Sequence, residues 1–300
     1  MKKFLLFFIT IFCVSSLTIR AQSEKSVAIL KSQPLVVVLK EEEPDKLKKL
    51  AKKPAELAAY KAFIANYNAQ IAELAPKLWH LSPSIEFKRE SEMDALVKDK
   101  NYQRGELTHE NFTVREHLAG GAARGPVLYA SSSQTAFLLS VISNGTKRVV
   151  MNMPIAPGVV YPSDIILCLK TAQYQLQQAA NGKNTNAQLA ESGKRLRSKT
   201  LLLDEAEVNG KLSAAEIKQV YPFAFQLVSR EAIETAVREG DTRYACVRIM
   251  PVMSDLFAQV VMDAADGAVL SMSMGGKGFK SGDVISKGNL KDFAQAAGGK

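Results

Sequence analysis

The sequence predicts an α/β protein, with α+β as the alternative class, built from two tandem copies of one unit. Two observations predict this class. Short apolar segments alternate with helical patterns along the chain, and the order strand, helix, strand, helix, strand, hairpin, helix occurs twice. Apolar residues make up 47% of the 300 residues and charged residues 23%, a globular balance that excludes a disordered or collagen-like chain.

The amino terminus has the pattern of an export signal. Lys2 and Lys3 precede an apolar segment over residues 4–17, which is shorter than the roughly 20 residues of a membrane-spanning helix. We expect cleavage after Ala21, so that residues 1–21 form a signal peptide. A retained membrane anchor is the less favoured interpretation, because the apolar segment is short.

The signal lacks the form that leads to lipid attachment, because Phe12 precedes Cys13 where a lipoprotein signal has a small residue. No later segment is apolar over the length of a membrane span. We therefore expect an exported protein, periplasmic or secreted, without a transmembrane segment after signal cleavage. Export permits a disulfide between Cys168 and Cys246, but we expect them on an amphipathic helix and in an apolar strand, which favours two separate buried thiols.

The first unit is expected over residues 22–180. Apolar runs predict its strands, the pair Asn144-Gly145 predicts a tight hairpin turn, and Ser163 or Asp164 is expected to cap its last helix. The expected elements are Leu35–Leu39, a helical insert over 45–78, Pro83–Phe87, Glu90–Lys98, a strand after Asn101-Tyr102, Ala136–Ser143, Lys147–Met153 and a helix ending at Ala180.

A polar segment over residues 181–198, rich in Asn, Lys, Ser and Gly, is predicted as a linker to the second unit, which spans 199–300. In that unit Ser213 and Glu216 form a capping box at the start of a helix. The expected elements are Thr200–Asp204, Leu212–Val220, Phe223–Val228, Arg230–Glu239, Arg243–Met250, Leu256–Met262, Ala268–Met274 and Asn289–Ala297.

The agreement of seven elements in order indicates an internal duplication, although residue identity between the halves is low. Each unit needs helices on at least one face of its mixed sheet, because an uncovered apolar sheet face is unstable in water. The two units are expected to share an interface, and a pseudo-twofold axis is one arrangement for it.

The helical insert carries an apolar stripe at heptad-like spacing, with two interpretations. The helix packs on its own sheet, or it docks a partner or a second copy of the chain. The residues of the possible interface are Leu57, Tyr60, Ile64, Tyr67, Ile71 and Leu74.

The sequence carries no catalytic, metal-binding or cofactor-binding motif with the required residue types and spacing, so we expect no such site. His109 and His117 are eight residues apart rather than the four of a zinc-binding helix, and a solvated strand edge is expected around them. The Gly-rich segment 275–282 lacks the spacing of a phosphate-binding loop, although its Lys277 and Lys280 offer a possible anion contact.

Nucleic acid is not an expected partner. Loss of Lys2, Lys3 and Arg20 with the signal lowers the formal net charge from +9 to +6, and no motif interleaves basic and aromatic residues. A protein partner or a homo-oligomer fits the composition better.

Residues 199–274 resemble the small α/β modules of the curli-secretion lipoprotein family and of the Tol amino-terminal domain. The resemblance rests on Phe225–Arg230 leading into a helix, on Tyr244–Arg248, and on the Asp-Gly hairpin turn that follows. It implies non-catalytic work in envelope assemblies, although the chain lacks the lipid-attachment Cys of such lipoproteins. The whole chain resembles uncharacterised exported proteins of Bacteroidota, which imply no activity.

Three functions follow as expectations. The first is a non-enzymatic exported protein that acts by protein–protein or cell-surface contact, for instance in an envelope assembly. The alternative is a hydrolase or carbohydrate-active protein with a carboxylate site between the two units. The third is a binder of small anions through Lys277 and Lys280.

Overall fold

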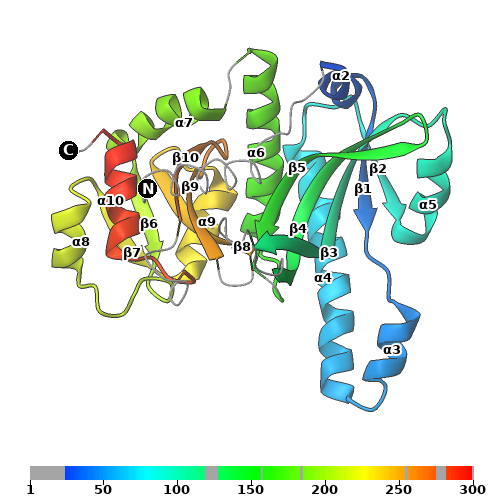
Figure 1. Cartoon of the computed structure of the whole chain (residues 1–300), viewed down its shortest axis with the longest axis horizontal. Helices are drawn as coiled ribbons and strands as arrows, with labels where there is room; N and C mark the ends of the chain where they lie inside the picture. Colours follow the sequence, from blue (N-terminus) through cyan, green and yellow to red (C-terminus); the bar gives the residue numbers. More distant parts are fainter. Residues whose placement is uncertain are drawn as a thin grey trace.

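The computed structural model describes residues 24–118, 128–156, 158–182, 185–253, 256–274 and 282–298. It contains two five-stranded mixed sheets with helices packed against them (Figure 1), which confirms the α/β class and the two similar units. Within the described ranges, every helix is too short or too polar to cross a bilayer. Lys277 and Lys280 lie outside the described residues.

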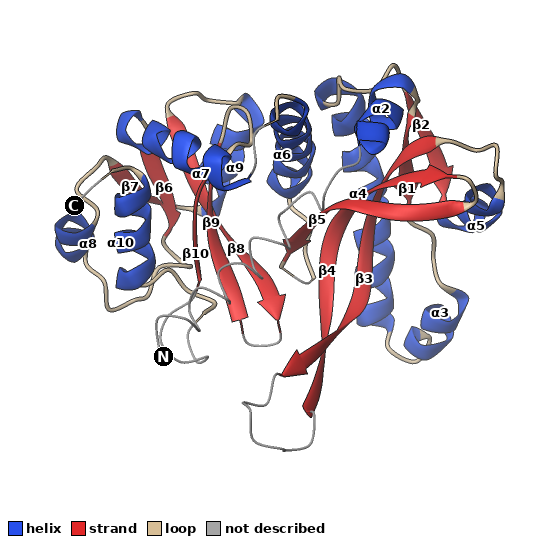
Figure 2. Ribbon diagram, turned by 45° about the horizontal axis from the view of Figure 1, so that its top comes forward, coloured by secondary structure: helices blue, strands red, loops and turns tan. Residues whose placement is uncertain are grey.

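The first sheet has the strand order β2-β1-β3-β4-β5, with β1 parallel to β2 and β3 and the rest antiparallel. Its long β3–β4 hairpin extends away from the body of the unit (Figure 2). The elements are α2 (Glu24–Ser32), β1 (Leu35–Leu39), α3 (Pro44–Leu50), α4 (Pro54–Leu78), β2 (Ile85–Arg89), α5 (Glu90–Lys98), β3 (Arg104–Leu118), β4 (Leu128–Ser143), β5 (Thr146–Ile155) and α6 (Pro162–Ala180).

The second sheet has the order β7-β6-β8-β9-β10, again with the strand that comes first in the sequence of the unit, β6, between two parallel neighbours. The elements are α7 (Thr185–Gly193), the short 3-10 helix η1 (Lys194–Ser198), β6 (Thr200–Asp204), α8 (Ala214–Val220), β7 (Phe225–Val228), α9 (Arg230–Glu239), β8 (Tyr244–Met253), β9 (Leu256–Asp263), β10 (Val269–Met274) and α10 (Lys287–Ala296).

The two sheets share their register as well as their strand order. In each sheet, one residue of the strand next to the parallel edge, β1 or β6, pairs with a residue on either side, and the two triplets occupy the same places in the sheet. They are Leu35 with Ile85 and Gly105, and Leu201 with Phe225 and Ala245. A common register is what duplication of one unit produces, because a one-residue slip would turn every side chain to the other face.

Helix and turn signals explain the local structure. Asn144 and Gly145 have φ angles of 54° and 71°, as a tight hairpin turn of the predicted kind requires. The Ser213 side chain caps α8 as expected. The start of α6 differs from the prediction, because Tyr161 is its N-cap and Asp164 is the third helical residue, whose carboxylate accepts from the Tyr161 N–H at 2.9 Å.

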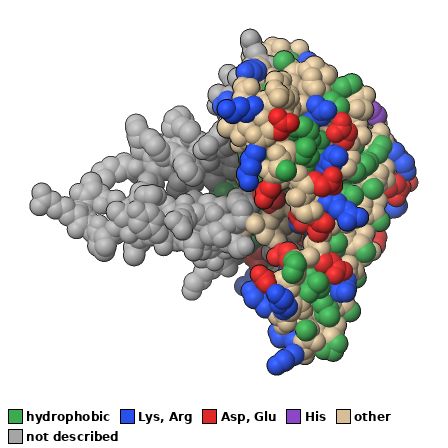
Figure 3. All heavy atoms as spheres, turned by 90° about the vertical axis from the view of Figure 1, so that its right-hand side faces the viewer, with side chains coloured by type: hydrophobic (Ala, Val, Ile, Leu, Met, Phe, Trp, Pro, Cys, Tyr) green, Lys and Arg blue, Asp and Glu red, His purple; other side chains and the backbone are tan. Residues whose placement is uncertain are grey.

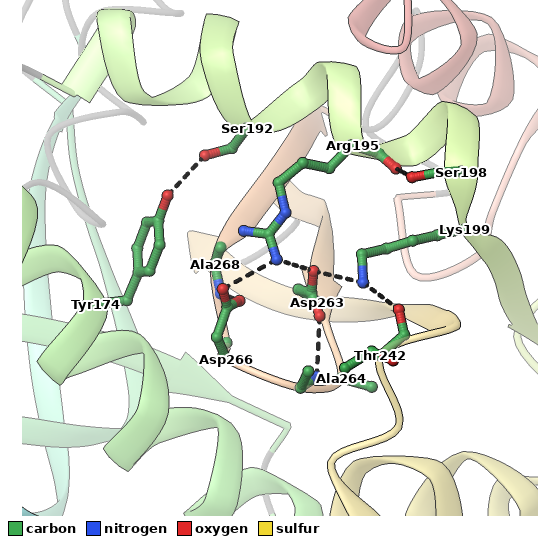
Figure 4. Close-up of polar contacts among 12 residues, drawn as sticks. Tyr174, Ser192, Arg195, Ser198, Lys199, Thr242, Asp263, Ala264, Asp266 and Ala268 are labelled. Atoms are coloured by element: carbon green, nitrogen blue, oxygen red, sulfur yellow. Dashed lines mark hydrogen bonds and ion pairs between the residues drawn. The ribbon is translucent and has the colours of Figure 1, made fainter.

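Residues 181–198 are not a plain polar linker, because they carry α7 and η1, which pack on β10 and the second unit. Figure 4 shows the main polar contact, where Arg195 on η1 and Lys199 both bind the fully buried carboxylate of Asp263. Arg195 also binds Asp266 at 2.9 Å, so η1 is fixed to the β9–β10 turn. Arg195 and Asp263 are far apart in sequence, so the polar composition of residues 181–198 alone did not predict this contact.

One core runs through both units, and α6 lies at its centre between the sheets (Figure 1). On the first sheet, α2, α4 and α6 cover one face and α5 covers the other. On the second sheet, α8, α10 and η1 cover the equivalent of the first face, whereas α9 and the α6 of the first unit cover the other.

The two units therefore follow each other head to tail rather than around a twofold axis. A twofold axis would place α10 on α5 in the way that α6 packs on α9. Instead α5 and α10 lie at opposite ends of the molecule (Figures 1 and 2). The duplicated unit thus uses one of its helical faces to dock onto the opposite face of its copy.

Candidate interaction surface and the polar cluster between the units

The apolar stripe of α4 packs mainly inside the protein. Ile64, Tyr67 and Ile71 are buried, and Tyr67 and Ile71 belong to the central core. Leu57, Tyr60 and Leu74 are half-buried. The structure therefore uses the stripe as the helix-on-sheet interpretation predicts, and it leaves the buried residues inaccessible to a docking partner.

The half-buried Tyr60 has a local role. Its hydroxyl oxygen accepts from the Glu43 backbone N–H at 2.9 Å, and the Lys46 ammonium lies 4.3 Å from the ring centre. These contacts fix α3 against α4, since they join the segment before α3 and its first turn to the α4 surface.

His109 is buried rather than solvated, contrary to the expectation. Its ring lies among Phe63, Tyr67 and Phe137, with ring centres between 5.2 and 5.9 Å away, and neither ring nitrogen has a hydrogen-bond partner. Loss of hydration lowers the pKa of His109 to about 3, so the ring is neutral. The described residues hold no cluster of metal-ligating side chains.

A buried polar cluster joins the two units at the amino terminus of α6. Arg248 of β8 forms an ion pair with Asp164 of α6, and both side chains are largely buried. The Ser163 backbone N–H donates to the Glu234 carboxylate of α9 at 2.8 Å, and the Ser163 hydroxyl donates to the same carboxylate. A long contact of 3.4 Å from Arg248 to the Ser163 hydroxyl connects these pairs.

The cluster continues at the end of β6. The Arg230 guanidinium binds Asp204 at 2.8 Å and Glu207, and it lies 5.5 Å from the centre of the Tyr161 ring. Burial raises the pKa of Glu207, against the opposing effect of Arg230. Each carboxylate of the cluster thus has a cation or a hydroxyl as its partner.

The space beside this cluster is too small for a substrate. A cavity lined in part by Asp164, Leu167, Arg248 and Met250 has a volume of about 10 Å³, which holds about one water molecule. Desolvated carboxylates do meet between the units, as the hydrolase alternative requires, but the cavity described beside them has room for about one water molecule. We call this polar cluster the clamp, because it holds α6 on the second sheet. Its residues are Ser163, Asp164, Asp204, Glu207, Arg230, Glu234 and Arg248.

The two cysteines stay apart in the same core. Cys168 of α6 and Cys246 of β8 are buried free thiols. Burial raises the pKa of both, so neither is a reactive thiolate.

A surface groove lies on the far side of the first unit, next to edge strand β2. Its volume is about 400 Å³, and its lining combines aromatic, proline and polar side chains. The lining residues are Pro76, Trp79, His80, Ser82, Pro83, Ser84, Ile85 and Phe87.

Hydrogen bonds fix the loop that forms this groove. The Trp79 indole N–H donates to the Ser82 hydroxyl at 2.9 Å, and that hydroxyl donates to the Leu30 carbonyl at 2.6 Å. Trp79 is 4% exposed, whereas Phe87 at the centre of β2 is 37% exposed. The groove is therefore a formed feature with an exposed aromatic ring at its rim.

Strand β2 pairs with β1 alone, so its outer backbone groups face away from the sheet. Figure 3 views the molecule from this side and shows apolar side chains interspersed among acidic and basic ones. Sequence reasoning predicted a strand here but not that it lies at an edge. The alternation of Glu86, Phe87 and Lys88 was the available signal, since edge strands commonly carry charges.

Comparison of the chain with protein-family models, with curated protein sequences and with solved structures finds no match. The fold defines a duplicated α/β protein. Its two notable features are the buried polar cluster between the units and the unpaired edge strand β2 with the groove beside it.

Proposed function

We propose that the protein is an exported, non-enzymatic protein that works by protein–protein contact in an envelope assembly, with the β2 edge and its groove as the contact surface. The observation that carries this proposal is the exposed Phe87 on an edge strand beside a formed groove of about 400 Å³. By contrast, each carboxylate of the clamp is bound by a cation or by Ser163, and the cavity beside the clamp has a volume of only about 10 Å³.

Edge strands bind proteins by a general mechanism. Their free N–H and C=O groups pair with an added strand, and the side chains beside them select the sequence. An exposed edge is also an aggregation hazard, so proteins usually cover it or charge it. Glu86, Lys88 and Arg89 supply charges around Phe87, which fits a surface that is selective for its partner.

The assignment to the cell envelope rests on the sequence. Lys2, Lys3 and the apolar segment over 4–17 support export with cleavage after Ala21. The resemblance of residues 199–274 to curli-secretion and Tol modules supports work in an assembly. Fractionation of the expressed full chain should yield an exported form that begins at Gln22; a form retained in the cytoplasm with its amino terminus intact would contradict export.

Contact through β2 is tested by photo-crosslinking in the producing cell. A photoreactive phenylalanine analogue replaces Phe87, and a matched analogue replaces Val159, which is 57% exposed on a loop before α6. We expect a discrete protein adduct at position 87 and none at 159. Equal labelling at both positions, or no adduct at 87, would contradict the proposed contact surface.

A further inference from the structure

The sequence of β2 is complementary to itself when two copies run antiparallel. We infer that two copies of the chain join their β2 strands around a twofold axis at Phe87, forming one continuous sheet. This inference rests on the proposed function, because it names the partner that the β2 edge binds. It uses the unpaired edge of β2, the pattern of its charges and the groove beside it.

The backbone of β2 is oriented for this pairing. The Ser84 carbonyl accepts from the Leu35 N–H of β1 at 2.9 Å, so backbone groups facing β1 belong to Ser84 and to alternate residues after it. The N–H and C=O groups of Ile85 and Phe87 therefore point outward. In an antiparallel pair, Phe87 then lies opposite Phe87 of the second copy as a pair that exchanges two hydrogen bonds.

The charges select this register over its neighbours. With Phe87 at the axis, Glu86 of each copy lies opposite Lys88 of the other, so two opposite-charge pairs form. A shift that centres Glu86 places two carboxylates opposite each other, and a shift that centres Lys88 places two ammonium groups together. Both of these shifts change the register by two residues. A change by an odd number of residues would put the grooves of the two copies on opposite faces of the joined sheet, because side chains alternate along a strand.

Glu86 and Lys88 already have ion-pair partners within their own chain, and these partners do not prevent the contact with a second copy. The Glu86 Oε1 atom is 3.5 Å from Arg104 Nε, and the Glu86 side chain is 35% exposed. The Lys88 Nζ atom is 3.5 Å from Glu92 Oε1, and the Lys88 side chain is 34% exposed. Both pairs are partly exposed to water, which screens the attraction between the charges, so pairs of this kind hold their partners weakly. Both charges are therefore free to form the contact across the strands.

The groove adds an apolar contact on one face of the joined sheet. Ile85 and Phe87 line it from β2, so the side chain of Phe87 from the second copy would lie over the same face. The edge of the second unit lacks these features, since β7 reads Phe-Gln-Leu-Val and carries no charge. The self-complementary charge pattern of β2 is therefore absent from β7, the strand at the equivalent place in the second sheet.

Charge reversal tests the inference without depending on a disruptive change. We expect the purified exported protein to be a dimer in sedimentation equilibrium, and Glu86→Lys and Lys88→Glu each to be monomeric, because each places like charges opposite one another. An equimolar mixture of the two variants should regain the dimer, since their charges complement each other. Lys77→Glu on α4, where Lys77 pairs with Glu73 at 2.8 Å, is the matched control and should remain dimeric.

The outcomes separate this inference from the proposed function. A monomeric wild-type protein, a dimer that both single variants retain, or a mixture that stays monomeric would overturn the β2 dimer. Crosslinking through position 87 to a different protein would also overturn the dimer while supporting the proposed function. Absence of both a dimer and an adduct at 87 would contradict both. Circular dichroism of each variant shows whether it is folded, so loss of the dimer is not mistaken for loss of structure.

Discussion

At the scale of single residues, the ion pair between Arg248 and Asp164 is a buried polar contact between the two units. Both groups are largely buried, and they come from opposite units, so each neutralises a charge that neither unit satisfies alone. Asp164 also accepts the Tyr161 N–H and thereby fixes the first turn of α6. Removing one member of such a pair leaves the other charged and buried, which is costly.

Arg248→Met tests this role. We expect it to lower the free energy of unfolding by about 3–5 kcal/mol, because Asp164 loses its buried partner. Chemical denaturation measures the change. Lys48→Met is the control, because Lys48 and Asp45 form a pair at 3.4 Å with both side chains more than three-quarters exposed, and we expect no measurable loss. Equal stability of wild type and Arg248→Met would contradict the clamp.

His109 gives the protein an acid sensitivity of its own. The pKa of its ring is lowered from 6.5 to about 3 by burial, so the unfolded chain binds a proton that the folded chain does not between these values. The contribution of His109 to stability is therefore complete above pH 6.5 and is lost as the pH falls toward 3.

His109→Phe should remove this sensitivity. At pH 5 the expected loss from His109 is about 2 kcal/mol relative to neutral pH, from the difference between the two pKa values. We expect the unfolding free energy of His109→Phe to fall less than that of wild type between pH 7 and 5. Parallel pH profiles of the two proteins would contradict the lowered pKa of His109, because they would mean that the folded and unfolded chains bind its proton equally well.

At the scale of elements, α4 illustrates how one helix divides its surface. Its carboxyl-terminal half packs Tyr67 and Ile71 on the first sheet, while its amino-terminal half extends beyond the sheet beside α3 (Figure 1). Its apolar stripe therefore contributes to stability mainly where it meets β1 and α6.

Alanine substitutions along the stripe should show this division. Ile71→Ala is expected to cost about 2–5 kcal/mol, because it leaves a cavity under a fully buried side chain. Leu57→Ala should cost well under half as much, since Leu57 is half-buried. Urea unfolding midpoints measure both. Similar losses would mean that the stripe is covered along its whole length, as a docking helix requires.

Local sequence patterns predicted the elements but not their neighbours. Asn144-Gly145 predicted its turn because positive φ angles favour those residue types. The burial of His109 depends on Phe63 and Tyr67 of α4 closing over it, and the order of η1 depends on Arg195 reaching Asp263. Contacts at such sequence separations leave no periodicity in the chain, so the clamp was not predicted. The β2 edge was not predicted either, although the charges of Glu86 and Lys88 were a local signal for it.

At the scale of the whole molecule, the head-to-tail order of the units determines which surfaces remain free. The second sheet has its α9 face covered by α6 of the first unit, which is why the core is continuous. The β2 edge of the first unit lies at the other side of the molecule, away from that interface (Figure 1). Duplication thus joins the units through one face and leaves β2 as an unpaired sheet edge.

Hydrogen–deuterium exchange at the two sheet edges tests this role of β2 most directly. The outward amides of Ile85 and Phe87 should exchange slowly in concentrated protein and faster on dilution, because a partner strand covers them. The amides of β7 serve as the internal reference, and their exchange should not depend on concentration. Rapid exchange at β2 at every concentration, no slower than at β7, would contradict the pairing of this edge with a second copy of the chain.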